Sequence, residues 1–200
     1  MVGMDALESS LVDRMVAQGE LPHFAQIGRE GFRKTIDISH PIVSPSVWTT
    51  LASGYQLNDH GIPHWTSSDG TPLRSMDVKV QRLWDVATLN GKTAWVVNWL
   101  MTIPVSTIQG VMTSEEVVYV GRMDEPGDQP PNRDAGVTTE MLVHPQSFCS
   151  VAAQAVPPPD WVATTPLGYQ FEHYSPLRHP LIRDESTVRI FEELVGTETP

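Results

Sequence analysis

The alternation of two hydrophobic spacings along the chain constrains its fold more than any other feature of the sequence. Apolar residues three or four positions apart, as in half-buried helices, occur in the stretches 7–18, 22–31, 47–54, 78–88 and 184–195. Strand-type patterns occupy 33–39 and 93–99, and residues 2–4 resemble the end of another strand. Because strands that alternate with helices pair in parallel, we predict an α/β fold, with a mostly parallel central sheet and helices on both faces.

The chain length and its proline content predict one domain with long loops. With 200 residues, of which 40% are hydrophobic, the chain can bury the core of a single domain. Two regions rich in proline, glycine and polar residues interrupt the periodic stretches, near 124–136 and 144–182. We therefore interpret residues 1–200 as one domain with two long surface loops.

Charge and cysteine content exclude several classes of protein. A formal net charge of −11 disfavours nucleic acid polymers as partners, because binding them requires clustered Lys and Arg side chains. The single cysteine, Cys149, cannot form an internal disulfide. No basic stretch followed by an apolar run opens the chain, and no run of about 18 apolar residues could span a membrane. We expect a cytoplasmic protein, unless an upstream segment precedes Met1.

Asp5 is the first candidate site residue. It follows the apolar residues 2–4 and precedes the helix predicted at 7–18. In a parallel sheet this position lies at the carboxyl edge, where ligands bind and where a carboxylate can hold a metal ion. An equally good interpretation is that Asp5 caps the helix by accepting a backbone N–H bond.

Ser44 is the second candidate. It lies in a turn between Pro41 and Pro45 that joins a predicted strand to a predicted helix, so its hydroxyl would also face the carboxyl edge. The start of the helix favours an incoming phosphate, and a bound cation could activate the weakly nucleophilic hydroxyl. Spacing alone favours a helix-capping role, for which Ser46 is a competitor.

His60 and His64 suggest a metal site only at first sight. Asp59 adjoins His60, and both side-chain types bind zinc. Gly61 and Pro63 rule out the continuous helix that would place the two imidazoles on one face. We predict instead that His60 is a turn residue satisfied by the backbone.

Three segments together resemble the type I phosphodiesterase and nucleotide pyrophosphatase family of the alkaline phosphatase superfamily. The order and spacing of the segments fit this family, and the chain is most similar to its bacterial branch of predicted phosphohydrolases or phosphomutases. The segments are Val2-Gly3-Met4-Asp5-Ala6, Ile42-Val43-Ser44-Pro45-Ser46-Val47-Trp48-Thr49-Thr50-Leu51-Ala52-Ser53-Gly54 and His60-Gly61-Ile62. Two further segments, Ala94-Trp95-Val96-Val97-Asn98-Trp99 and Gly110-Val111-Met112-Thr113-Ser114, continue the similarity.

The resemblance implies a metal-dependent hydrolase of phosphate mono- or diesters that acts on a small phosphorylated substrate. Asp5 matches the aspartate that binds one of two divalent metal ions, usually zinc. Ser44 matches the nucleophile, which also contacts the metal. The fold implied is alkaline phosphatase-like, and the oligomeric state is not implied.

Two departures from the family pattern change these expectations. Nucleotide pyrophosphatases have a phosphate-binding Asn three residues after the His-Gly-Ile triplet, whereas this chain has Trp65. The family's remaining ligands are an Asp-x-x-x-His, an adjacent Asp-His and a final His that lie well downstream, and no segment of this chain matches them, because Asp59-His60 belongs to an earlier loop. We therefore expect an incomplete, amino-terminal fragment of the catalytic domain, inactive alone, whose remaining zinc ligands lie outside this chain.

Two alternatives remain open at this point. A phosphomutase of the same superfamily would share Asp5 and Ser44, whereas a sulfatase is disfavoured because no Cys-x-Pro-x-Arg pattern lies near Ser44. A non-catalytic binding module or remnant would use Asp5 and Ser44 only as helix caps. In that case the tryptophan rings would pack in the core or hold a partner.

Overall fold

The structure is a computed structural model of the chain. It describes residues 1–5, 7–36, 38, 42–120, 136–158, 160–164 and 175–197. The contacts divide the chain into two units, residues 1–39 and residues 40–200, and each is described by itself.

The first unit contains two helices, α1 (Ser9–Ala17) and α2 (Pro22–Glu30). Gly19, with φ of +78°, separates them in a conformation that a residue with a Cβ rarely adopts. Proline at the first position of α2 suits a helix start because its missing N–H would have had no partner there. Both helices predicted from the spacing are confirmed.

Strands predicted in this unit are not formed. Residues 2–4, 33–36 and 38 carry no strand pairing, although residues 37 and 39 lie outside the described part of the chain. Alternating polar and apolar residues give a segment the capacity to form a strand, but a strand exists only when a neighbour pairs with its backbone. The prediction at 33–39 is therefore wrong for the residues described.

The second unit is built on a small mixed sheet in the order β1-β2-β3. Strand β1 (Ala94–Trp99) pairs in parallel with β2 (Gly110–Ser114), and β3 (Val143–His144) pairs antiparallel with β2. Position 110 requires glycine when the strands pair in this register, because a Cβ there would collide with the carbonyl oxygen of Ala94 on the adjacent strand. The strand predicted at 93–99 is confirmed.

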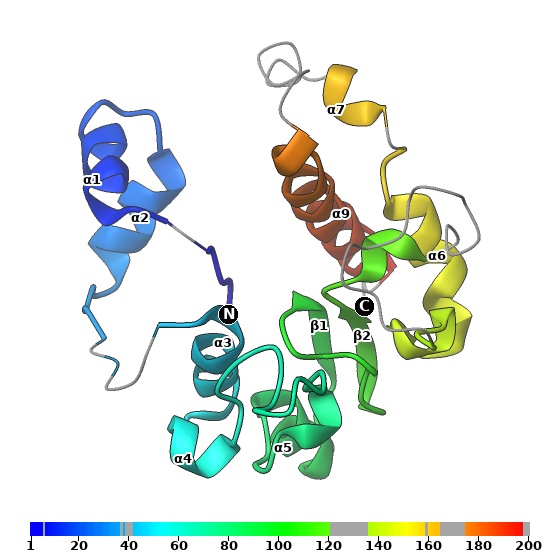
Figure 1. The fold of residues 1–200 in the computed structure, drawn as a ribbon. Coiled ribbons are helices and arrows are strands. Elements are labelled where there is room, and N and C mark those ends of the chain that lie inside the picture. Colours follow the sequence, from blue (N-terminus) through cyan, green and yellow to red (C-terminus); the bar gives the residue numbers. More distant parts are fainter. Residues whose placement is uncertain are drawn as a thin grey trace. The chain divides into compact units, whose positions relative to one another are not determined.

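One face of the sheet is covered by α3 (Ser44–Ser53) and α5 (Leu83–Leu89) (Figure 1). Their buried side chains meet the strands in one apolar cluster. The buried members are Ala52, Trp84, Val96, Trp99, Ile108 and Met112, with Trp48 packed against them. Three indole rings thus anchor these two helices to β1.

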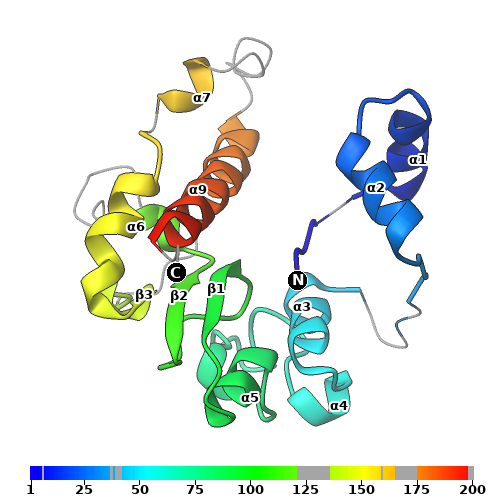
Figure 2. The same cartoon turned by 180° about the vertical axis from the view of Figure 1, so that it is seen from behind.

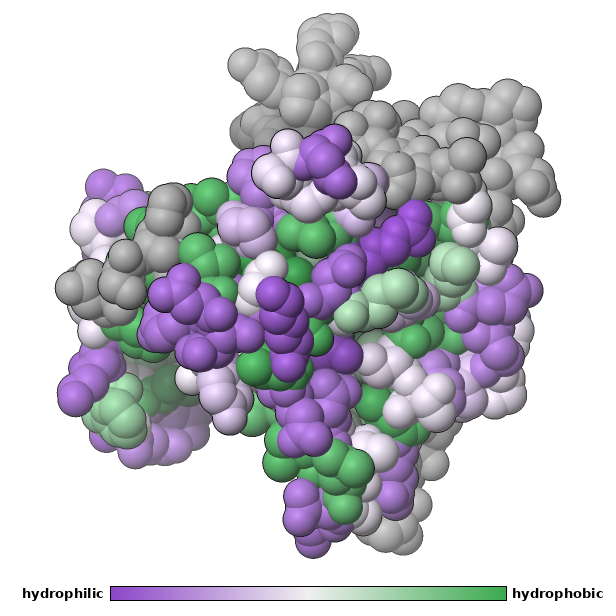
Figure 3. All heavy atoms as spheres, turned by 60° about the horizontal axis from the view of Figure 1, so that its bottom comes forward, coloured by the Kyte–Doolittle hydropathy of each residue, from purple (hydrophilic) through white to green (hydrophobic). Residues whose placement is uncertain are grey.

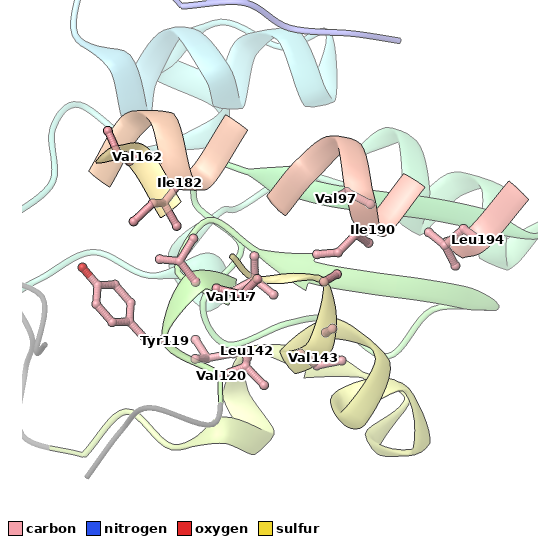
Figure 4. Packing of buried hydrophobic residues seen from close by; sticks show 14 residues of the cluster. Val97, Val117, Tyr119, Val120, Leu142, Val143, Val162, Ile182, Ile190 and Leu194 are labelled. Carbon is pink, nitrogen blue, oxygen red and sulfur yellow. The ribbon is translucent and has the colours of Figure 1, made fainter. Parts of the chain in front are cut away.

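The opposite face is covered by α6 (Cys149–Ala155) and α9 (Ser175–Thr197) (Figure 2). Ile190 and Leu194 of α9 lie over Val97 of β1, and Leu142 and Val143 belong to the same core (Figure 4). Helices therefore lie on both faces, and the expected α/β, alkaline phosphatase-like architecture is confirmed. The sheet is mixed, since β3 runs antiparallel.

Several shorter elements complete the unit. They are α4 (Leu57–His60), α7 (Trp161–Thr164) and the 3-10 turns η1 (Ser75–Asp77), η2 (Val117–Tyr119), η3 (Thr139–Met141) and η4 (Gln146–Phe148).

Two predicted boundaries differ from the structure. The helix expected at 78–88 begins only at Leu83, because the Asp85 carboxylate accepts the Arg82 N–H and fixes the helix start there. The loop expected at 144–182 instead contains α6, α7 and the first turns of α9. Short helices among prolines are hard to recognise from spacing, since α6 has only two turns. Most of the loop predicted near 124–136 lies outside the described residues.

The surface shown in Figure 3 carries hydrophobic residues in several small groups among hydrophilic ones. Exposed apolar side chains of α5 include Leu83 and Leu89. Scattered apolar residues are ordinary on protein surfaces. Among the described helices, none is both long and apolar enough to cross a membrane.

Candidate functional site

Asp5 does not cap the first helix. Glu8 occupies the N-cap position of α1, and its carboxylate accepts the N–H groups of Ser10 (3.1 Å) and Leu11 (2.7 Å). Hydrogen bonds from the Ser10 hydroxyl and these amides lower the pKa of the Glu8 carboxyl. Asp5 lies exposed, three residues before this cap. The capping interpretation of Asp5 is therefore wrong.

Ser44 is likewise not a helix cap. It is the first residue of α3, whereas the N-cap is Val43, which has an extended backbone and no capping side chain. Ser46, the competing candidate, lies inside the first turn and is buried. Within the described part of the chain the half-buried Ser44 hydroxyl forms no hydrogen bond. The Ser44 hydroxyl is thus not committed to stabilising the helix.

Packing fixes the start of α3 beside the end of β1. The Trp99 indole N–H donates to the Trp48 carbonyl oxygen (3.2 Å), and the two rings meet edge to face with centroids 4.9 Å apart. Trp99 is the last residue of β1, and Trp48 lies about one turn after Ser44. The helix start therefore lies at the carboxyl edge of the sheet, where ligands of α/β proteins bind.

His60 has the structural role that the sequence predicts. It is fully buried; its Nδ1 accepts the Ile62 N–H (3.1 Å), and its Nε2 lies 3.0 Å from Thr50 Oγ1 in α3. Because Nδ1 is an acceptor, the neutral ring carries its hydrogen on Nε2 and donates it to Thr50. His64 is exposed, whereas both ring nitrogens of His60 have protein partners.

A buried carboxylate at the carboxyl edge escaped the sequence prediction. Glu115 follows β2 directly, is 6% exposed, and binds the backbone of the loop that leaves β1. Its neighbours in this loop include Met101, a non-glycine residue with φ of +62°, a backbone conformation that costs about 1–3 kcal/mol. In the sequence, Glu115 is recognisable only as an acidic residue immediately after a strand. Because Glu116 follows it, the two glutamates would be expected to be exposed to solvent.

The described residues do not by themselves form a metal centre. No group of three or more His, Cys, Asp or Glu side chains in this part of the chain could hold an ion. Asp5 and Ser44 offer oxygen ligands of a type that divalent cations accept, but they belong to different units. The oxygen atoms of Asp5 and Ser44 are suitable metal ligands, but two ligands are fewer than a complete metal site requires.

Comparison with known proteins identifies the family to which the chain belongs. Residues 1–180 match the family model described as type I phosphodiesterase / nucleotide pyrophosphatase, which is most of the 200-residue chain. No match was found to a curated protein or to a solved structure. The family consists of phosphoric ester hydrolases that are generally metal-dependent and act on small phosphorylated substrates. The chain belongs to the type I phosphodiesterase/nucleotide pyrophosphatase family of the alkaline phosphatase superfamily.

Proposed function

We propose that this chain contributes to a metal-dependent hydrolase of phosphate mono- or diesters in which Ser44 is the nucleophile. The observation that carries the proposal is the Ser44 hydroxyl, which begins α3 at the carboxyl edge of the sheet without serving as a cap. A serine in that place is poorly explained by stability alone, because capping is the usual structural reason for serine at a helix start.

The start of α3 suits a phosphoryl group. Pro45 has no N–H to donate, but the dipole of α3 favours negative charge at the start of the helix. Ser44 Oγ would form a bond to phosphorus while the bond to the leaving ester oxygen breaks and that oxygen acquires a proton. Water would then cleave the phosphoryl-serine and regenerate the hydroxyl. Packing of Trp48 on Trp99 keeps the helix start in place for both steps.

Asp5 and Ser44 each match a metal-ligand position of the family, and we propose that each supplies an oxygen ligand to a divalent ion, with zinc as the proposed metal. When bound, such an ion lowers the pKa of a coordinated hydroxyl and offsets the negative charge of the phosphoryl group. The remaining ligands would come from residues outside this chain, and we propose that residues 1–200 alone are inactive.

Our proposal for the substrate is based on Trp65, which occupies the position where nucleotide pyrophosphatases have a phosphate-binding Asn. Trp65 is 43% exposed, and its carbonyl oxygen accepts the Leu73 N–H (2.8 Å) beside the isolated antiparallel bridge between Thr66 and Pro72. An indole has one N–H donor, whereas an Asn amide has two N–H donors and a carbonyl oxygen, so Trp65 does not reproduce the contacts of the Asn. We propose a small phosphorylated substrate without a nucleotide requirement.

The test is hydrolysis of p-nitrophenyl phosphate mono- and diesters by the full-length gene product, with and without zinc. Ser44→Ala should abolish turnover, whereas Ser53→Ala, at the other end of α3, should retain it. Chelation should remove activity and zinc should restore it. Turnover that survives Ser44→Ala would refute the proposed nucleophile.

The rival interpretation is a non-catalytic binding module. Trp48, Trp84 and Trp99 pack in the core, so in that case an exposed ring such as Trp65 would hold the partner. A phosphomutase remains distinguishable by product: it would move a phosphoryl group within a sugar phosphate and release no inorganic phosphate.

A further inference from the structure

Trp99, the last residue of β1, faces the other side of the sheet from the one that a regular strand would give it. Side chains two positions apart in a regular strand point to the same face. Val97 belongs to the core beneath α6 and α9, whereas Trp99 packs with Trp48 in the core beneath α3. Asn98 between them has a left-handed backbone (φ of 55°), and the pairing with β2 is irregular there. This bulge turns Trp99 toward the helix that begins with Ser44.

Glu115, directly after β2, holds the segment that follows this bulge. Its Oε1 accepts the Met101 N–H (2.9 Å), and its Oε2 accepts the Thr102 N–H (3.1 Å). Met101 is the second residue of the loop with a left-handed backbone, with φ of 62°. A residue with a side chain adopts this conformation only when its surroundings hold it there. The two oxygens of one buried carboxyl group therefore fix two successive backbone amides of the loop.

Hydrogen-bond contacts continue from Glu115 to α3. Thr102 Oγ1 lies within hydrogen-bond distance of both Glu115 Oε2 (2.8 Å) and the Trp99 carbonyl oxygen (2.6 Å). The Trp99 indole N–H in turn donates to the Trp48 carbonyl oxygen of α3 (3.2 Å). The backbone of Trp99 is thus held by the loop, while its ring is held against the helix.

We propose that Glu115 is a positioning residue, which holds the bulged end of β1 so that Trp99 faces α3 and keeps the start of that helix at the carboxyl edge. Glu115 acts through the backbone of the loop and through Trp99. The adjacent Glu116 has a different partner, Arg183 of α9 (3.4 Å). The catalytic consequence of this inference rests on the proposed role of Ser44, but the link between the loop and α3 can be measured without turnover.

The experiment is NMR spectroscopy of the full-length gene product with isotope-labelled tryptophan, in which the Trp99 indole N–H signal is identified by its loss in Trp99→Phe. Glu115→Gln keeps the shape of the side chain, but one end of its amide is an NH2 group that cannot accept from a backbone N–H. We expect the Trp99 signal to move upfield as the bond to Trp48 weakens. The signal comes from the folded protein, so lower stability alone does not move it. A folded Glu115→Gln protein with this signal unmoved would overturn the proposal.

Matched variants test the same link. Glu116→Gln should leave the Trp99 signal in place, because Glu116 does not contact the loop through a bond like those of Glu115. Thr102→Val removes the hydroxyl and should move the signal upfield by less than Glu115→Gln, whereas Thr102→Ser keeps the hydroxyl and should restore the wild-type position. If Glu115→Gln does not fold, the Thr102 pair decides: an unmoved Trp99 signal in Thr102→Val would contradict the proposal.

Kinetics separate the positioning role from the proposed nucleophile. Glu115→Gln should lower kcat for p-nitrophenyl phosphate esters about tenfold or more with KM near the wild-type value, because a displaced nucleophile impairs the chemical step more than binding. Glu116→Gln should retain the wild-type kcat. Loss of turnover in Ser44→Ala together with an unchanged kcat in Glu115→Gln would overturn the positioning role alone. Turnover that survives Ser44→Ala would refute the nucleophile, and the Trp99 signal would still decide whether Glu115 holds the loop.

Discussion

Helix α1 begins shortly after Asp5 and helix α3 begins with Ser44, but different interactions stabilise the two helices. Helix α1 begins with the Glu8 side chain bound to two backbone amides, and none of its residues is buried. Helix α3 has no side-chain cap, yet Pro45, Ser46, Thr49 and Ala52 are buried, and Trp48 packs on Trp99. The start of α1 is stabilised locally, whereas α3 is stabilised by its packing on the sheet.

This difference shows how a helix start can stay available for chemistry. A side chain that caps a helix occupies the amide groups that would otherwise bind an anion. Helix α3 is instead held by packing from the side, so Ser44 at its start has no capping role. We therefore predict that substitutions at the packed side of α3 lower stability, whereas substitutions at Ser44 change function.

Loss of the tryptophan contact should have the largest effect. Trp99→Ala removes a buried indole, its hydrogen bond to Trp48 and two edge-to-face contacts, so we expect a loss of about 3–5 kcal/mol in unfolding free energy. Chemical denaturation measures this loss. Trp65→Ala is the matched control. Because the Trp65 ring is exposed, its removal should lower the unfolding free energy by less than about 1 kcal/mol. Equal losses in the two variants would contradict the packing account.

A smaller loss is expected inside the first turns of α3. Thr49 is 2% exposed, and its hydroxyl donates to the Pro45 carbonyl oxygen (2.7 Å). Thr49→Val keeps the shape and removes this bond, which should lower the unfolding free energy by about 1 kcal/mol. Thr107→Val, at an exposed position, is the control and should be nearly neutral in the same denaturation experiment.

The cap of α1 should depend on pH, and its effect should be local. The native pKa of Glu8 is lowered, so its contribution is present above the ordinary value of about 4.5 and is lost as the pH falls through the native value. The protection factors of the Ser10 and Leu11 amides, which compare each exchange rate with the intrinsic rate at the same pH, should fall at acidic pH, and Glu8→Gln should weaken that response. Exposed Glu20 provides the control Glu20→Gln. Protection factors at Ser10 and Leu11 that do not change between neutral and acidic pH would refute the assignment of Glu8 as the cap.

Ser44→Ala should have the smallest effect on stability. Because the hydroxyl forms no hydrogen bond within the described residues, the unfolding free energy should change by less than about 0.5 kcal/mol. A loss larger than about 1 kcal/mol in thermal or chemical unfolding would show that Ser44 has a structural role after all.

Local patterns predicted the helices and the first strand of the sheet. Helices α1, α2, α3 and α9 were expected because apolar spacing, proline starts and glycine stops are properties of short segments. Gly54, which ends α3 with φ of +75°, is an example. The pattern 33–39 failed because strand formation depends on a partner elsewhere in the chain.

The sequence identified the positions of the candidate site residues but not the contacts that these residues make. Sequence placed Asp5 and Ser44 beside helix starts, yet could not show that Glu8 caps α1 or that Val43 precedes α3 without a cap. Glu115 was not found because its burial follows from the fold of the loop 98–104 around it. Burial of a charged residue type depends on tertiary contacts, which single-sequence spacing does not contain.

The most direct test of the central claim is to trap the phosphorylated enzyme. The full-length gene product is mixed with a phosphate ester, quenched in acid and digested, and the peptide that contains Ser44 is examined by mass spectrometry. The account predicts a phosphoryl group on Ser44 that is absent from the Ser44→Ala variant. Turnover accompanied by no modified peptide, or by modification of another residue, would contradict the assignment of Ser44 as the nucleophile.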